Sequence, residues 1–115
     1  MSASADCLFC KIVAGEIPAD VVHTTDRTVA FRDLNPQAPL HALVVPREHA
    51  DNAAATAESD AETFAALALA AREVAAAEGY DSYRLVFNTG ADAHQTVFHT
   101  HLHVLAGRSM TWPPG

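Results

Sequence analysis

Three histidines stand on alternate residues near the end of the chain, at His99, His101 and His103. An imidazole can act near neutral pH as a base, a nucleophile or a metal ligand. Because successive side chains of a strand point to opposite faces, a strand over 99–105 would present all three imidazoles on one face. The residues that alternate with them are mostly apolar and would face the core: Phe98, Thr100, Leu102, Val104 and Ala106. We therefore expect the functional site to lie on the histidine face of this strand.

Two alternatives apply to this pattern. The histidines could supply only a polar outer face, although histidine is not a favoured strand residue and three at period two are unusual. All three could hold one metal ion, but their first and last Cα atoms would lie roughly 13 Å apart at about 3.3 Å per residue. Zinc-bound nitrogens sit only about 2.0–2.1 Å from the ion. One ion shared by all three is therefore implausible, whereas a pair two residues apart with a ligand from elsewhere remains possible.

Cys7 and Cys10 form a second pattern with chemical content, Cys-x-x-Cys. In a reducing compartment such a pair is more often a metal or redox site than a disulfide. A structural zinc is commonly held by two thiolates and two imidazoles, for which His49 and His99 are candidates. Two alternatives stay open here: a redox motif, disfavoured because no strand precedes it, and a pair of inert buried thiols.

The bulk composition predicts one ordinary soluble domain. The chain has 115 residues, half of them hydrophobic, and a formal net charge of −7 with only seven lysines and arginines. This charge argues against a nucleic-acid partner, although a local pocket could still bind a small anion. The longest apolar run, within 64–77, is interrupted by Arg72 and Glu73, so no membrane span is expected. The N-terminal residues lack the pattern of a signal peptide, and we expect a cytoplasmic protein.

Periodicity and turn residues predict the elements that must position these side chains. A short helix is expected over 7–14, with Leu8, Ile12 and Phe9 as the residues that face inward. A long helix is expected from a capping box at Ser59 to Glu78, before Gly79. The expected strands and connections are strands 21–25, 28–33, 41–46, 83–88 and the histidine strand, with loops at 26–27, 35–39, 51–59 and 89–95. This order predicts an α+β fold with a largely antiparallel sheet.

The long helix is apolar on nearly every face, mostly through alanine. Helices without a broad polar face are usually buried from two sides, which would fit a subunit interface. The alternative is that alanine is simply there because it favours helix.

The histidine pattern resembles the signature of the histidine-triad (HIT) superfamily, in which three histidines alternate with apolar residues. Residues 99–105 follow this signature, with Thr100 at a position that is usually more apolar. Four other stretches resemble the nucleotide-binding Hint branch of that superfamily: 7–12, 15–19, 31–39 and 112–115. Sister groups that cleave dinucleoside polyphosphates often carry glutamine where His103 stands, so this histidine favours the phosphoramidase-type branch. The resemblance implies a single HIT domain over 1–115, with one long helix and a short N-terminal helix.

The resemblance also implies an activity. Members of this family are homodimers that bind purine nucleoside monophosphates and hydrolyse or transfer them at the α-phosphorus. His101 would be the nucleophile that forms a nucleotidyl-histidine, and a bond from its other nitrogen to a backbone carbonyl would fix its tautomer. His103 would hold the phosphoryl oxygens or protonate a leaving amine, two roles that the residues do not separate. His41 would steady the triad.

Further residues fall on positions that the resemblance connects with substrate or metal. Asp33 would receive the ribose hydroxyls, and Trp112 would reach toward the partner subunit's site. The base would lie in an apolar slot, and the phosphate or leaving group would meet polar side chains: Leu8, Phe9, Ile12, Phe31 and Leu34 for the base, and Asn88, His94, Gln95 and Thr96 for the other end. Many bacterial members with Cys-x-x-Cys bind zinc, which here implies a structural Zn²⁺ on Cys7, Cys10, His49 and His99.

The leading hypothesis is therefore a hydrolase of purine nucleoside 5′-phosphoramidates that works through a nucleotidyl-histidine. Dinucleoside polyphosphate cleavage or nucleotidyl transfer through the same intermediate is one alternative, and a nucleotide-binding scaffold protein is another. A zinc hydrolase is disfavoured, because four protein ligands would leave no open position for a catalytic water.

Overall fold

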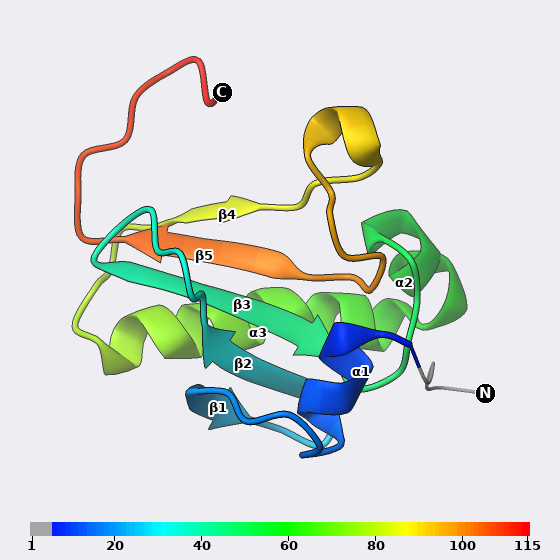
Figure 1. Cartoon of the computed structure of the whole chain (residues 1–115). Coiled ribbons are helices and arrows are strands. Elements are labelled where there is room, and N and C mark those ends of the chain that lie inside the picture. The colour runs from blue at the N-terminus through cyan, green and yellow to red at the C-terminus, as the bar shows by residue number, and fades with distance from the viewer. Residues whose placement is uncertain (1–5) are drawn as a thin grey trace.

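The computed structural model describes residues 6–115 and is built on one five-stranded sheet (Figure 1). The strands follow the order β1-β2-β3-β5-β4, and every neighbouring pair is antiparallel. Their bounds are β1 Val21–Thr24, β2 Thr28–Arg32, β3 Leu40–Pro46, β4 Arg84–Val86 and β5 Leu102–Ala106. The helices are α1 Leu8–Val13, α2 Ala53–Ser59 and α3 Ala61–Ala77, with a 3₁₀ turn at Ala91–Ala93. The expected α+β fold, with a largely antiparallel sheet, one long helix and a short N-terminal helix, is confirmed.

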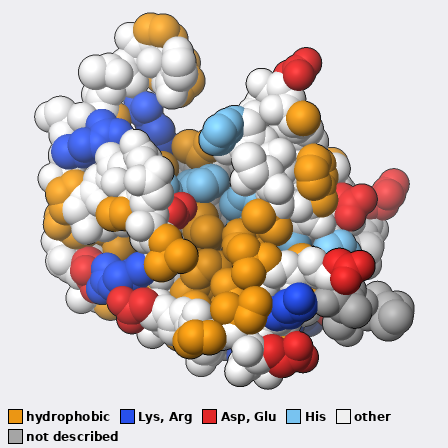
Figure 2. All heavy atoms as spheres, viewed as in Figure 1, with side chains coloured by type: hydrophobic (Ala, Val, Ile, Leu, Met, Phe, Trp, Pro, Cys, Tyr) orange, Lys and Arg blue, Asp and Glu red, His pale blue; other side chains and the backbone are white. Residues whose placement is uncertain are grey.

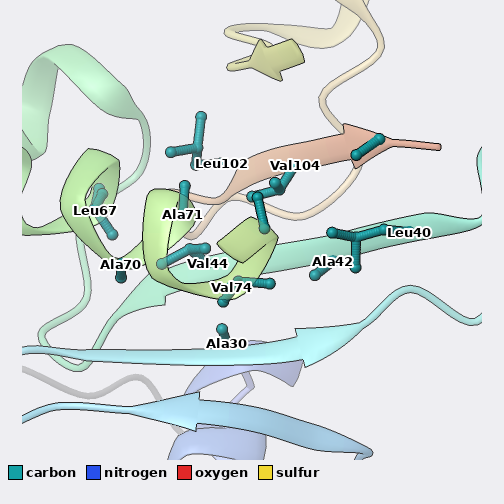
Figure 3. Close-up of a cluster of buried hydrophobic side chains, with 12 residues drawn as sticks. Ala30, Leu40, Ala42, Val44, Leu67, Ala70, Ala71, Val74, Leu102 and Val104 are labelled. Carbon is teal, nitrogen blue, oxygen red and sulfur yellow. The ribbon is translucent and has the colours of Figure 1, made fainter. Parts of the chain in front are cut away.

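The main core lies between the sheet and α3. Figure 3 shows α3 side chains directed toward those of the central strands. The helix contributes Leu67, Ala70, Ala71, Val74 and Ala75, and the sheet contributes Ala30, Leu40, Ala42, Val44, Leu102, Val104 and Ala106. Period-two alternation in β3 sends the other side chains of that strand to the opposite face, so the strand is buried on both sides. That opposite face carries α1 and a second apolar cluster formed by Phe9, Val29, Phe31, Leu43 and Val45.

The start of α3 differs by one residue from the expected capping box. Ser59 is the last residue of α2, and Asp60 is the N-cap of α3, where its side chain accepts the Thr63 N–H. Arg27 holds this cap from the β1–β2 turn, with its guanidinium 2.9 Å from the Asp60 carboxylate. The expected connector over 51–59 contains a seven-residue helix instead of a single turn, because Asn52 caps it and accepts the Ala55 N–H.

One face of α3 is buried and the other is exposed in the single chain. Leu67 and Ala71 are fully buried, whereas Leu69 is 52% exposed on the opposite side of the helix. The chain alone therefore covers α3 from one side. In residues 6–115, no helix has the length and apolar character needed to cross a membrane.

The histidine segment is a strand only in its second half. β5 begins at Leu102, so His99 and His101 precede the strand and only His103 lies within it. Thr100 leaves the expected pairing because its N–H donates to the Ala50 carbonyl at 2.8 Å. Its hydroxyl lies 2.7 Å from that of Thr56 in α2, and both threonines are buried. The expectation that Phe98 faces the core is wrong, since its side chain is half exposed.

Candidate functional site

A cavity of about 730 Å³ opens on the sheet face opposite α3. Figure 2 shows hydrophobic side chains gathered beside histidines on this face. One end of the cavity is apolar and is lined by Leu8, Phe9, Ile12, Ile17, Phe31 and Leu43. The other end is polar and is lined by Asp33, His41, Asn88, His94, Thr96, His101 and His103. Such a cavity can hold a ligand that is flat and apolar at one end and anionic at the other.

His101 lies where these two ends meet, and its neighbours determine which nitrogen carries the proton. Nδ1 lies 2.8 Å from the carbonyl oxygen of His99. A carbonyl can only accept, so Nδ1 bears the hydrogen, and in the neutral imidazole Nε2 keeps a free lone pair. The Phe9 ring and the imidazole pack in a T-shaped arrangement, with ring centroids 5.0 Å apart. His101 is therefore held with an unprotonated Nε2, as a nucleophile requires.

His103 and His41 form a chain of hydrogen bonds whose direction is also defined. The backbone N–H of Gln37 donates to His41 Nδ1 at 3.0 Å, so the hydrogen of a neutral His41 is on Nε2. That Nε2 lies 2.9 Å from His103 Nδ1 and 3.4 Å from an oxygen of Asp33. His103 accepts at Nδ1 and consequently carries its own hydrogen on Nε2. The chain ends in an N–H donor that the cavity-lining imidazole of His103 can offer to a ligand.

Burial keeps these two imidazoles neutral. Desolvation lowers the pKa of His41, against the opposing effect of the Asp33 carboxylate. Desolvation, followed by the neighbouring imidazoles of His101 and His41, lowers the pKa of His103 to about 4. A neutral His103 can donate a hydrogen bond, but it cannot give up that hydrogen without becoming an anion. Its geometry and pKa both favour binding of an oxygen over proton donation.

We expect NMR of ¹⁵N-labelled protein to show His103 as the Nε2–H tautomer at neutral pH. Its pKa is about 4 in the fold against an ordinary 6.5, so the unfolded chain takes up this proton first as the pH falls. The contribution of His103 to stability is therefore complete above pH 6.5 and is lost as the pH falls toward 4. Imidazole ¹⁵N shifts recorded between pH 7 and 4 measure both quantities. Protonation of His103 near pH 6.5 would contradict the proposed chain.

Cys7, Cys10, His49 and His99 meet at the N-terminal end of α1, and one ligand atom of each lies within 4.8 Å of the others. His99 Nδ1 is 3.4 Å from both sulfur atoms and 3.2 Å from His49 Nδ1. Ligands of a tetrahedral zinc lie about 3.3–3.8 Å apart, given bonds of about 2.0–2.3 Å. The spacing of this donor set fits a zinc ion.

The hydrogen bonds behind these imidazoles fit metal binding as well. His99 Nε2 lies 2.9 Å from the Pro46 carbonyl oxygen, so it carries the hydrogen and leaves Nδ1 free to bind a metal. His49 Nε2 faces the Asp51 carboxylate at 3.4 Å, which places the hydrogen on Nε2 and leaves Nδ1 of His49 free to bind a metal. Burial lowers the pKa of His99 to about 4, which keeps the imidazole neutral as ligation requires.

In a second group with metal-ligand side chains, the hydrogen bonds do not leave the ligand nitrogen free for a metal. Asp33, His41 and His103 also bring three ligand atoms within 4.8 Å. A metal on His41 Nε2 would require the hydrogen on Nδ1, where the Gln37 N–H already donates. This group therefore fits a hydrogen-bond network, and of the two groups found in residues 6–115 the cysteine-containing one fits a metal.

The structure brings most of the expected substrate-binding residues to the cavity but not all of them. Leu34 lines its mouth with a fully exposed side chain, and Asp33 lies deeper beside His41. Gln95 does not line the cavity, because its buried amide holds the loop together through Gly90 N–H and the carbonyls of Asp51 and Val97. Trp112 is also outside the cavity, 82% exposed on a C-terminal segment that runs away from the sheet (Figure 1).

Several residues that line the cavity were missed from the sequence, among them Leu43, Gln37, Ile17 and Arg32. Leu43 lies two residues after His41 on the same face of β3, so period-two alternation could have identified it. Gln37 acts through its backbone N–H, for which its side-chain type gives no signal.

The chain is similar to known proteins in sequence and in fold. A family model described as the HIT domain matches residues 14–110. An uncharacterized HIT-like protein of Synechocystis sp. is 48% identical over 111 residues, covering 96% of this chain and 97% of the relative. A solved HIT family hydrolase from Legionella pneumophila is 48% identical with a TM-score of 0.90, covering 96% of this chain and all of the other. A HIT family hydrolase from Clostridium thermocellum is 40% identical with a TM-score of 0.90, covering 95% and 96% of the two chains.

Proposed function

The chain belongs to the HIT-domain family, and from that premise we propose that it hydrolyses purine nucleoside 5′-phosphoramidates at the α-phosphorus. The observation that carries the proposal is the tautomer of His101, whose Nδ1 bond to the His99 carbonyl leaves Nε2 unprotonated in the cavity. The reaction would pass through a covalent nucleotidyl-histidine.

The two ends of the cavity support a nucleotide as the ligand. The purine would lie in the apolar end, between α1 and the sheet, where Phe9, Ile12 and Phe31 offer flat or branched surfaces. The ribose hydroxyls would donate to the Asp33 carboxylate, which can only accept when ionised. The α-phosphate would then lie at His101 and His103, where the Nε2–H of His103 would donate to a phosphoryl oxygen.

The reaction divides into two displacements at phosphorus. His101 Nε2 would attack the phosphorus, forming an N–P bond while the P–N bond to the amine breaks. The amine leaves with the electron pair of that bond and takes a proton from solvent. Water then attacks the same phosphorus, breaks the bond to His101 and releases its proton to solvent, giving the nucleoside 5′-monophosphate. The neutral imidazole is regenerated, and His103 binds phosphoryl oxygen throughout.

Turnover of an adenosine 5′-phosphoramidate with a fluorogenic amine tests this proposal directly, with a dinucleoside polyphosphate assayed beside it. A higher kcat/KM for the phosphoramidate supports the proposed substrate class. Faster cleavage of the polyphosphate would favour the alternative activity through the same intermediate. Tight AMP binding without turnover of either substrate would identify a nucleotide-binding protein and reject the enzyme.

Asp33→Asn is expected to raise KM for the ribonucleotide substrate about tenfold, because a charge-assisted hydrogen bond to the ribose is weakened. The steady-state KM of a 2′,3′-dideoxy analogue provides the control, since this substrate has no hydroxyls to donate. The substitution should change that KM much less. Equal effects on both substrates would show that Asp33 acts through His41 and not on the ribose.

We also propose that Cys7, Cys10, His49 and His99 hold a structural Zn²⁺. A bound zinc would cross-link the chain through four protein ligands. It would not hold a catalytic water, because the four side chains complete its usual coordination. The site would tie α1 to the residues that follow β3 and to the segment before β5. His99 also presents the carbonyl that orients His101, so the same residue contributes to both sites.

A homodimer is a further part of the proposal. The face of α3 that the chain leaves uncovered carries Leu69, and β4 lies at the edge of the sheet with Leu85 partly exposed. Phe64 of α3 stacks on Phe87, which follows β4, so these two elements adjoin. A second copy could cover both surfaces at once.

A further inference from the structure

The loop over residues 34–39, between β2 and β3, supplies the N–H that defines the direction of the His41–His103 chain. It contains Pro36 and Pro39, which have no N–H to donate. Among residues 6–115, no backbone–backbone hydrogen bond anchors this loop. Its position therefore depends on side chains that bind it, and these side chains can influence the site without lining the cavity.

Arg108 ties this loop to the segment that follows β5. Its Nε donates to the Gln37 carbonyl oxygen at 2.8 Å. The loop and the segment after β5 lie at the same end of the sheet (Figure 1). Within the described residues the guanidinium has no carboxylate partner, and its Nη1 donates to the Ser109 carbonyl oxygen at 3.2 Å. Arg108 thus binds backbone carbonyls, and the one outside its own segment belongs to Gln37.

The backbone beside Arg108 packs directly against the same loop. Gly107 has a φ of 97°, a left-handed conformation that glycine adopts without penalty. A Cβ at this position would lie 2.9 Å from the Pro39 Cβ and 2.8 Å from the Tyr80 hydroxyl oxygen. There is no room here for a side chain, so the turn after β5 contacts the loop at two adjacent positions, 107 and 108.

These contacts close a ring of interactions that begins and ends on one segment of the chain. From His103 in β5 the ring passes to His41 at 2.9 Å and to the Gln37 N–H at 3.0 Å. It returns through the Gln37 carbonyl to Arg108, which follows the same strand. The N–H and the carbonyl of Gln37 belong to different peptide groups. Arg108 consequently acts by fixing the place of Gln37 and not by polarising its N–H.

The place of Gln37 matters because two neutral imidazoles can share a hydrogen in either direction. With its hydrogen on Nδ1, His41 would accept at Nε2 from His103 Nδ1, and His103 would then present a lone pair to the cavity. The Gln37 N–H opposes this arrangement, since two donors would face each other. The Asp33 carboxylate, 3.4 Å from His41 Nε2, favours the same direction across a longer distance.

We propose that Arg108 is a positioning residue, which holds Gln37 so that the His41–His103 chain presents an N–H to the phosphoryl oxygen. Arg108 does not line the cavity and touches no reacting atom. The consequence for catalysis rests on the proposed phosphoramidase function, whereas the direction of the chain is a property of the protein without substrate.

Two substitutions of similar length separate the hydrogen bond from the bulk of the side chain. Arg108→Gln keeps an N–H donor at the position of Nε, and Arg108→Met has none. In substrate-free Arg108→Met, the ¹⁵N signal of His103 Nε2 should move toward that of an unprotonated nitrogen. Its kcat for an adenosine phosphoramidate should fall about fivefold, the scale of one hydrogen bond, while KM changes little. Arg108→Gln should keep the wild-type ¹⁵N shifts and at least half of the wild-type kcat.

Arg47→Met provides the matched control. Arg47 follows β3 at the end of the strand opposite the loop, and its Nε donates to the Thr25 carbonyl oxygen at 2.9 Å. This is the same type of bond made to a different turn, so its loss tests for a general effect of destabilisation. Arg47→Met should leave the His103 shifts and kcat at their wild-type values, even where it lowers the thermal midpoint.

The results that overturn the inference are distinct from those that overturn the proposed function. Unchanged His103 shifts in Arg108→Met, or equal changes in Arg47→Met, would reject the hold of Arg108 on the chain. Changed shifts with an unchanged kcat would reject its role in the reaction while the phosphoramidase stands. A wild type that turns over no phosphoramidate would reject the proposed function, and the NMR comparison alone would then decide whether Arg108 directs the chain.

Discussion

Replacing His101 with alanine is expected to lower kcat for an adenosine phosphoramidate by at least about a thousandfold, the scale on which enzymes lose activity with their nucleophile. Its Nε2 is the one imidazole nitrogen at the junction of the cavity that the described hydrogen bonds leave with a lone pair. His103 cannot replace it, because its outward nitrogen carries the hydrogen. Steady-state turnover under saturating substrate measures the loss.

Three controls make this result specific. AMP affinity, measured by calorimetry, should change little in His101→Ala, since Phe9, Asp33 and His103 remain. Quenched wild-type reactions should show a nucleotide-sized mass increase on the peptide that contains His101, and the alanine variant should not. His23→Ala should keep wild-type kcat, as its side chain lies outside the cavity. Turnover by His101→Ala at more than a tenth of the wild-type rate would rule out the covalent route.

Removing the two thiolates, in Cys7→Ser/Cys10→Ser, is expected to lower the thermal midpoint by about 10 °C or more. A structural zinc contributes its binding free energy to the fold, and a change of 1 kcal/mol shifts the midpoint of a domain this size by about 4–8 °C. Serine at position 7 preserves the capping of α1, because its oxygen can accept the Cys10 N–H that the sulfur accepts now. The expected loss therefore reports on the metal.

Metal analysis and calorimetry together check this prediction. The wild-type protein should contain about one zinc per chain and should melt like the double variant after treatment with a strong chelator. The variant itself should be insensitive to the chelator. Purified wild-type protein with no bound metal and an unchanged midpoint in the double variant would contradict the zinc site.

Much of the fold follows from local sequence patterns. The hairpin of β1 and β2, the apolar run of β3 that ends at a proline, and the glycine after α3 each have a local physical cause, and the structure has all three. The start of α3 was predicted one residue too early, because Ser59 and Asp60 are adjacent and both are good caps. Asp60 is the cap because Arg27, far away in sequence, holds its carboxylate. Tertiary contacts of this kind decide between local alternatives that propensity leaves nearly equal.

In the site as well, local patterns predict some features and tertiary contacts determine the others. Alternation predicted that the three histidines share one strand face, yet His99 and His101 precede β5 and His99 joins a different cluster from the other two. The Thr100 N–H donates to the Ala50 carbonyl and not to a neighbouring strand of the sheet, and the local sequence pattern does not predict this hydrogen bond. The direction of the His41–His103 chain depends on a backbone N–H at Gln37, so it also required the three-dimensional arrangement.

The side chains of residues 99, 100 and 101 each lie in a different part of the molecule. They contact the cysteine cluster, helix α2 and the cavity, respectively. Because these three residues are consecutive, the backbone between them has no spare length. An insertion or deletion of one residue in this stretch would move side chains out of these three environments. Natural variation in loop length should consequently accumulate elsewhere, and protein engineers should graft new segments well away from this junction.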